Sequence, residues 1–137
     1  MTDLPKAVSH EPLLARSLEA SLTVADIRAS LRWYRDVMGF TIDREFEREG
    51  VLRAVSIRAG SVRLLLSQDT GARGAERVKG KGFSLQLTTP QDIDALAAGI
   101  VARGAAMDTP PSDMMGVRFF RLRDPDGFRF TISAPRD

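Results

Sequence analysis

The sequence contains no cysteine and only one histidine among its 137 residues. The missing thiols exclude disulfide bonds, cysteine nucleophiles, zinc–cysteine sites and iron–sulfur clusters. The single histidine, His10, lies in a polar N-terminal segment, where we expect a solvated side chain rather than a metal ligand or a base. No Gly-x-Ser-x-Gly or serine–histidine arrangement predicts a nucleophilic triad. The available chemistry is therefore that of oxygen and nitrogen groups.

Long apolar runs and a large excess of one charge are also absent. No run approaches the roughly 20 apolar residues that cross a bilayer, and the N-terminus lacks the charged-then-apolar order of a secretory signal. The 20 lysines and arginines are interleaved with 18 acidic residues, without the basic stripe that binds nucleic acid. We expect one compact cytoplasmic domain with neither a nucleic-acid nor a membrane partner.

Apolar patterns predict a strand, a helix and three further strands in the first half. Apolar and polar residues alternate over 18–24, the period of a strand with one packed face. Asp26 can cap a helix whose apolar residues recur at intervals of three and four until Gly39 ends it. Three β-prone runs separated by glycine turns follow at 40–46, 51–58 and 62–67.

The second half begins after a segment rich in glycine and charge, 69–82, which we predict to be a mobile linker because it has little apolar surface to bury. Pro110 and Pro111 predict a loop, and an Asp-Pro-Asp-Gly turn occupies 124–127. The predicted strand, helix and two strands of this half lie at 83–89, 91–103, 117–123 and 128–133.

The two halves share an offset of 66 residues. This offset carries Asp26, at the start of the first helix, onto Asp92, and it aligns 62–67 with 128–133. Two matches with one offset, at the same places in the element order, indicate a duplication. Each half would place a helix on one face of a curved sheet and leave the other face as a lined hollow suited to a ligand.

Four segments resemble the vicinal oxygen chelate superfamily of glyoxalases, bleomycin-resistance proteins and dioxygenases. They are LTVADI at 22–27, WYRDVMGF at 33–40, DIDAL at 92–96 and RDPDG at 123–127. The resemblance spans about 18–133 and implies an α+β fold in which two tandem βαβββ modules form a curved mixed sheet around a cavity. It also implies a homodimer. The expected organisation is an arm at 1–17 and one domain at 18–135, with modules at about 18–68 and 82–133.

Enzymes of that superfamily typically hold a divalent metal with one side chain from each of four strands, two in each module. The resemblance places these positions at Glu19, Leu65, Thr131 and one residue among Phe83, Ser84 and Leu85. One carboxylate opposite a leucine cannot assemble a site of three or four ligands. We therefore predict no metal and no other cofactor.

Side chains of the same strands are candidates for binding a ligand. Glu19 shares strand phase with Ser21, which favours the cavity over pairing with an arginine at a strand edge. Arg63 and Arg129 are related by the offset of 66 and would favour an anionic ligand, although both could instead reach solvent or pair with acidic residues. Aromatic and amide residues complete the predicted site, which comprises Glu19, Ser21, Arg63, Leu65, Phe83, Gln86, Phe119, Arg129 and Thr131.

These residues predict a metal-independent protein that binds a small molecule, such as an antibiotic or an aromatic or anionic metabolite, rather than an enzyme. The alternative is a divergent metal-dependent lyase, similar to lactoylglutathione lyases, or a dioxygenase. A metal-free lyase or isomerase with Glu19 as general base would be a further variant of that alternative. A structural or regulatory subunit with a vestigial cavity is the third hypothesis.

Overall fold

A computed structural model describes residues 11–72, 74 and 78–136, which form two four-stranded sheets. The first half contains β1 (Ala20–Val24), α1 (Ile27–Arg32), the π-helix η1 (Trp33–Met38), β2 (Thr41–Arg48), β3 (Val51–Ala59) and β4 (Val62–Gln68). The second contains β5 (Ser84–Thr88), α2 (Ile93–Ala102), β6 (Met107–Met114), β7 (Val117–Arg123) and β8 (Arg129–Pro135). Their strand orders, β1-β4-β3-β2 and β5-β8-β7-β6, are equivalent. The prediction of two tandem βαβββ modules is confirmed.

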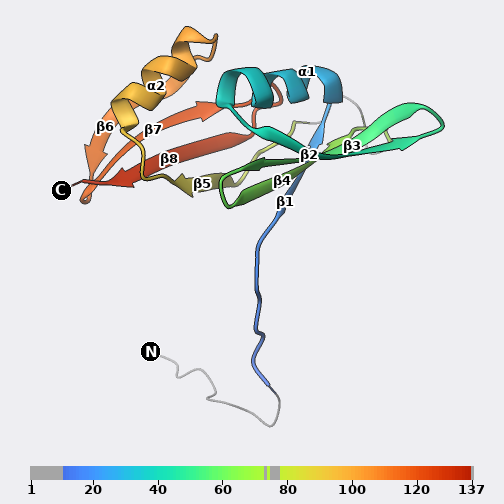
Figure 1. The fold of residues 1–137 in the computed structure, drawn as a ribbon, viewed down its shortest axis with the longest axis horizontal. Coiled ribbons are helices and arrows are strands. Elements are labelled where there is room, and N and C mark those ends of the chain that lie inside the picture. The colour runs from blue at the N-terminus through green and yellow to red at the C-terminus, as the bar shows by residue number, and fades with distance from the viewer. Residues whose placement is uncertain (1–10, 73, 75–77, 137) are drawn as a thin grey trace.

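Both helices lie on the same side of the two sheets (Figure 1). The strand residues that face them form one continuous core drawn from both modules. Its fully buried side chains include Leu22, Val24, Tyr34, Leu66, Phe120 and Phe130. Strand alternation places the remaining side chains of each sheet on the opposite face, which neither of the helices among the described residues covers. None of the described helices is long and apolar enough to cross a membrane.

The first helix begins and ends where the sequence predicts. The Asp26 carboxylate accepts hydrogen bonds from the backbone nitrogens of Arg28 and Ala29, at 3.1 and 3.2 Å, and so caps the helix. Gly39 ends it with φ of 89°, a left-handed conformation that favours glycine. The wider π-helical winding of η1 was not predicted, because the apolar spacing of the sequence does not distinguish it from an α-helix.

The prediction of a loop at Pro110 and Pro111 is wrong. Residues 107–114 form β6, the edge strand of the second sheet, which pairs with β7. The register shifts between Met107 and Thr109 and again between Thr109 and Ser112, so both prolines lie in an irregular stretch. An edge strand with bulges tolerates proline, because it needs fewer backbone N–H donors than a central strand.

The segment predicted as a linker, 69–82, is anchored at both ends. Lys79 Nζ lies 3.0 Å from Asp69 Oδ2, and the two side chains are only 7% and 8% exposed. Gly80 packs against the turn that follows β7. The predicted mobility of residues 73 and 75–77 lies outside the described residues, as do 1–10 of the predicted arm, including His10.

The Asp-Pro-Asp-Gly turn of the second module holds the start of the first module's helix. Asp126 Oδ1 accepts a hydrogen bond from the Ala25 nitrogen at 2.9 Å, and Oδ2 accepts one from Ser30 Oγ at 3.3 Å. Gln68 supports the same segment, since its amide accepts from the Ile27 nitrogen and donates to the Ala25 carbonyl oxygen. The two modules are therefore joined by specific polar contacts as well as by the shared core.

We expect Asp126→Ala to lower the free energy of unfolding by about 1–2 kcal/mol, because the Ala25 nitrogen and the Ser30 hydroxyl lose their acceptor. Denaturant unfolding followed by circular dichroism measures the change. The matched control is Asp108→Ala, which removes an exposed carboxylate paired with Arg123 and should cost less than about 1 kcal/mol. Equal losses in the two variants would contradict a joining role for Asp126.

Candidate ligand-binding face

The sheet faces that point away from the helices, here called the open face, carry mostly polar side chains in equivalent rows. In the first sheet, the register places Ser21, Leu65, Ser56 and Arg44 side by side across the four strands. In the second, the row consists of Gln86, Thr131, Arg121 and Thr109. The next row of the second sheet contains Thr88, Ser133, Phe119 and Ser112.

Most of the residues predicted to bind a ligand lie on this face. Ser21 pairs with Leu65, and Gln86 pairs with Thr131. Arg129 lies between Ser84 and Arg123 in the second sheet. In the first sheet, Arg63 pairs with Arg58, and its Nη1 is 3.9 Å from Asp43 Oδ2. The structure thus brings Ser21, Arg63 and Leu65 together in one sheet, and Gln86, Phe119, Arg129 and Thr131 in the other.

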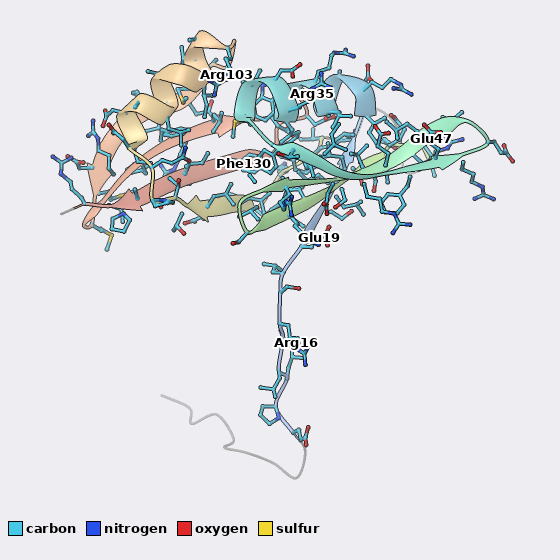
Figure 2. The ribbon with its side chains drawn as sticks, viewed as in Figure 1. Arg16, Glu19, Arg35, Glu47, Arg103 and Phe130 are labelled. Atoms are coloured by element: carbon cyan, nitrogen blue, oxygen red, sulfur yellow. The ribbon has the colours of Figure 1, made fainter. Side chains whose placement is uncertain are left out.

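Two predicted residues each lie one position before the start of a strand, outside its pairing. Phe83 precedes β5 by one residue, and its ring centroid is 6.0 Å from that of Phe128, a member of the core. Glu19 is exposed where the N-terminal segment joins β1, on the side away from the helices (Figure 2). Neither side chain has a hydrogen bond or ion pair to the open face in the described part of the chain.

The register also resolves which residue of β5 corresponds to Glu19. Ala20 pairs with Leu64, so Glu19 lies at the level of Arg63. Arg129, the repeat counterpart of Arg63, pairs with Ser84. The four positions implied by the resemblance are therefore Glu19, Leu65, Ser84 and Thr131, which supply one carboxylate, two hydroxyls and a leucine.

This donor set does not fit a divalent cation, which requires several imidazole or carboxylate ligands. Elsewhere among the described residues, no group of three histidine, cysteine, aspartate or glutamate side chains has a geometry that could hold a metal. The described residues at these positions therefore support no metal-dependent step.

Arg121, which the sequence analysis missed, is the best-positioned cation of the open face. Its guanidinium carbon lies 4.8 Å from the centroid of the Phe119 ring, which is only 5% exposed. Its Nε donates a hydrogen bond to Thr131 Oγ1 at 3.3 Å. Within the described residues, no carboxylate pairs with Arg121. Alternation along β7 gives the signal that was overlooked, because residues 119, 121 and 123 have the phase opposite to buried Phe120 and Leu122.

The first sheet carries a comparable pair. The guanidinium carbon of Arg44 is 4.8 Å from the centroid of the Phe46 ring, and Phe46 is 38% exposed. Arg44 occupies the row of Leu65, as Arg121 occupies that of Thr131. Each sheet therefore presents an arginine stacked on a phenylalanine.

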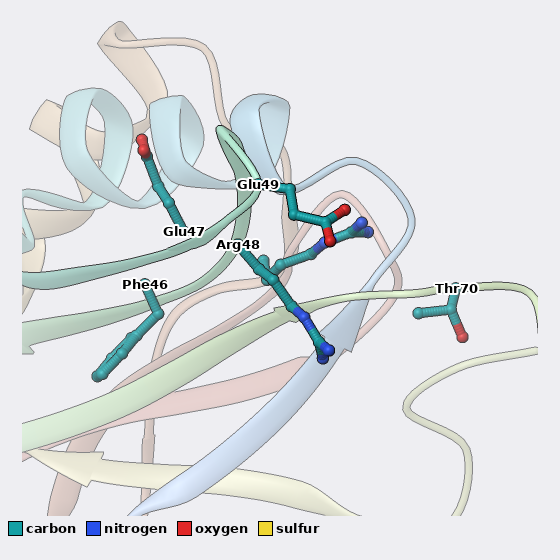
Figure 3. Close-up of a pocket in the computed structure, with 6 residues that line it drawn as sticks. Phe46, Glu47, Arg48, Glu49 and Thr70 are labelled. Carbon is teal, nitrogen blue, oxygen red and sulfur yellow. The ribbon is translucent and has the colours of Figure 1, made fainter.

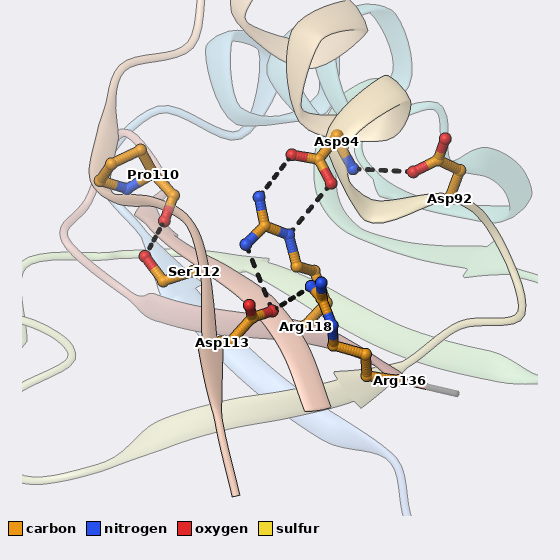
Figure 4. A network of polar contacts seen from close by, with 7 residues as sticks. All are labelled: Asp92, Asp94, Pro110, Ser112, Asp113, Arg118 and Arg136. Carbon is orange, nitrogen blue, oxygen red and sulfur yellow. Dashed lines mark hydrogen bonds and ion pairs between the residues drawn. The ribbon is translucent and has the colours of Figure 1, made fainter. Parts of the chain in front are cut away.

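Other arginines of the second module form ion pairs with carboxylates. Arg118 makes two hydrogen bonds to Asp94, of 2.8 and 3.0 Å, and a third to Asp113, which also accepts one from Arg136 (Figure 4). The hydrogen bonds from Arg118 hold the pKa of Asp94 below its usual value. Arg123 pairs with Asp108 at 2.8 Å. These pairs fasten α2, β6 and β7 together, whereas Arg121 keeps its terminal nitrogens available.

A separate hollow of about 580 Å³ lies at the tip of the β2–β3 hairpin (Figure 3). Glu47 and Phe46 point to opposite sides of β2, so their side chains do not converge on one ligand. The lining combines both charges with one aromatic ring, and comprises Phe46, Glu47, Arg48, Glu49, Arg53 and Thr70. This hollow is a weaker candidate than the face around Arg121.

Comparison with known proteins identifies a family and a fold. The family model for the Glyoxalase/Bleomycin resistance protein/Dioxygenase superfamily matches residues 16–132. No curated protein matches the chain at significant similarity. A solved member of the same superfamily from Sphaerobacter thermophilus DSM 20745 is 24% identical with a TM-score of 0.73, and the match covers 88% of this chain and 98% of that one.

Two further solved structures share the fold. TnmS3, an antibiotic binding protein from Streptomyces sp. CB03234, is 20% identical with a TM-score of 0.73, covering 91% of this chain and 99% of that one. TioX from Micromonospora sp. ML1 is 20% identical with a TM-score of 0.70, covering 88% and 99%.

Proposed function

Since this chain belongs to the glyoxalase/bleomycin resistance protein/dioxygenase superfamily, we propose that it binds a planar anionic small molecule on its open face without a metal. The observation that carries the proposal is Arg121 lying on Phe119 and donating to Thr131. The binding protein is proposed to act as a homodimer, because a second copy would cover the face that the helices leave bare.

The geometry of Arg121 suits a carboxylate. A guanidinium presents two parallel N–H donors to both oxygens of a carboxylate, and such charge-assisted pairs are stronger than neutral hydrogen bonds. Thr131 Oγ1 accepts the hydrogen bond from Arg121 Nε, and the guanidinium lies over the Phe119 ring, which orients its plane. Because the side chain is held before the ligand arrives, less conformational entropy is lost on binding.

The neighbouring side chains favour a ligand with an apolar body and a few polar groups. Gln86 can donate and accept hydrogen bonds beside Thr131, while Ser21 and Leu65 offer a hydroxyl and an apolar contact in the other sheet. The shared fold with the antibiotic binding protein TnmS3 supports an antibiotic that carries an acidic group as one class of ligand.

The test uses 2-naphthoate as the anionic probe and 2-naphthamide as its uncharged counterpart. We expect 2-naphthoate to raise the unfolding temperature, because only the folded state offers the site. In calorimetry it should bind equally well with and without EDTA, because the proposed site contains no metal. Arg121→Met should weaken binding by at least about tenfold, the effect of losing a hydrogen bond to a charged group. Arg123→Met removes a cation from the same strand that is already paired with Asp108, and should leave affinity nearly unchanged.

Equal binding by the Arg121 and Arg123 variants, or no binding of 2-naphthoate by the unmodified protein, would overturn the proposal. Stoichiometric stabilisation by Ni²⁺ or Mn²⁺, abolished by EDTA, would instead favour the metal-dependent lyase or dioxygenase.

A further inference from the structure

We infer that the hollow at the tip of the β2–β3 hairpin is a second binding site, which takes an aromatic phosphate monoester. This inference goes beyond the proposed function, because the hollow lies in the first module and shares no residue with the face around Arg121. Its volume of about 580 Å³ is within the range of small-molecule sites. Four of its lining residues carry the argument, namely Phe46, Arg48, Arg53 and Thr70.

A β-bulge in β3 brings Arg53 to the open face of the hairpin. The register shifts between Phe46 and Glu47, because Arg53 is an extra residue of β3 with no partner in β2. The core residues on either side, Leu52 and Val55, are 3% and 0% exposed. The two residues between them therefore both point away from the core, onto the side where Phe46 lies. Bulges commonly redirect a side chain in this way beside a binding site.

Arg48 lies on the same side of the hairpin as Phe46. It follows Glu47, which pairs with buried Leu52, so alternation gives Arg48 the phase opposite to the core. Figure 3 shows Arg48 and Phe46 on one side of β2 and Glu47 on the other. The carboxylate of Glu47 is therefore directed away from the two arginines, and Glu49, in the turn, supplies the other carboxylate of the lining.

The charges of Arg48 and Arg53 are available to a ligand. Neither forms an ion pair with a carboxylate in the described part of the chain, in contrast to Arg118 and Arg123. Two such guanidiniums favour a ligand group that carries more than one negative charge. A phosphate monoester carries about 1.5 to 2 negative charges at pH 7 and offers three acceptor oxygens, whereas a carboxylate carries one charge.

The other two residues supply a hydroxyl group and an aromatic surface. Thr70 Oγ1 accepts a hydrogen bond from the Ala72 nitrogen at 3.4 Å, so its own O–H can donate to a phosphate oxygen. Arg44 lies over one face of the Phe46 ring, yet Phe46 is still 38% exposed and lines the hollow. The ring can therefore stack on an aromatic group of the ligand while the arginines hold its phosphate.

The experiment titrates 2-naphthyl phosphate and inorganic phosphate into Arg121→Met protein, which lacks the proposed carboxylate anchor. Calorimetry and phosphorus NMR should show one equivalent of 2-naphthyl phosphate bound per chain. Arg48→Met and Arg53→Met, each added to this background, should weaken binding of both compounds at least about tenfold. The matched control is Arg58→Met, which removes an exposed cation of β3 outside the hollow and should leave both affinities nearly unchanged. Circular dichroism verifies that each variant is folded.

Phe46→Leu separates the aromatic contact from the phosphate contact. It should weaken binding of 2-naphthyl phosphate at least about fivefold, a loss typical of aromatic stacking, and leave the affinity for inorganic phosphate unchanged. Absence of 2-naphthyl phosphate binding, equal losses in the Arg53 and Arg58 variants, or a Phe46 variant that weakens both compounds alike would overturn the inference. Because every titration uses protein without Arg121, these outcomes do not depend on whether 2-naphthoate binds the unmodified protein.

Discussion

Asp124→Ala is expected to lower the free energy of unfolding by about 3–4 kcal/mol, a loss typical of a broken buried hydrogen-bond network. Asp124 is 5% exposed, and its carboxylate accepts hydrogen bonds from Tyr34 Oη at 2.7 Å and from the nitrogens of Asp126 and Phe128 at 2.9 and 2.8 Å. Alanine leaves all three donors without their acceptor inside the protein. Tyr34 is fully buried, so the loss reaches the centre of the core.

Denaturant unfolding measures this loss, and Asp124→Asn tests its cause. Burial raises the pKa of Asp124 above its usual value. The folded carboxyl therefore holds its proton more tightly than the unfolded chain does, and its contribution to stability falls as pH rises from the unfolded pKa through the folded one. Asparagine keeps an acceptor without the charge, so we expect a smaller loss than with alanine. The stability of the unmodified protein relative to Asp124→Asn should decline as pH rises through that window, and a constant difference would contradict burial of the charge.

Gly80→Ala is expected to cost about 2–4 kcal/mol, because it combines backbone strain with overpacking. Gly80 has φ of +71°, and a Cβ there would lie 2.8 Å from the Gly127 carbonyl oxygen and 2.9 Å from the Phe128 Cα. Both are backbone atoms, which cannot move aside as the end of a flexible side chain can. The substitution would push the connecting segment away from the turn at 124–127, where Asp124 makes its hydrogen bonds.

Gly82→Ala is the matched control for this prediction. Its φ is +89°, but a Cβ there would meet nothing within 4 Å. The substitution should therefore introduce backbone strain alone and lower the free energy of unfolding by only about 1 kcal/mol. The difference between the two variants isolates the close approach of Gly80 to the turn. Unfolding midpoints that coincide for the two variants would show that the approach contributes nothing to stability.

The repeat predicted more of the fold than the residue preferences did. The offset of 66 carries Thr41–Arg48 onto Met107–Met114 residue for residue, and therefore implies β6. Pro110 and Pro111 predicted a loop there instead, because proline opposes a central strand and the sequence does not reveal which strand lies at an edge. The helix limits at Asp26 and Gly39 were predictable because they depend on local capping chemistry.

The resemblance placed Leu65 and Thr131 in the predicted site, and only the register shows that Ser21 lies beside Leu65 and Gln86 beside Thr131. The stacking of Arg121 on Phe119 depends on side-chain rotamers that the sequence does not specify. The buried pair of Lys79 and Asp69 was not predictable either, because nothing local in the sequence brings side chains from the two ends of the connecting segment together. Phe83 stays a prediction, since its half-exposed ring suits a core contact with Phe128 as well as a ligand.

The turn at 124–127 also breaks the equivalence of the duplicated halves. Asp124 and Asp126 both reach into the first module, while the residues at the same places in the first half, Arg58 and Gly60, offer no carboxylate in return. A protein made of two copies of the first module would lack these contacts, because neither copy would supply the carboxylates that accept hydrogen bonds from Tyr34 and Ala25. The two modules are therefore specialised and mutually dependent, and neither could replace the other.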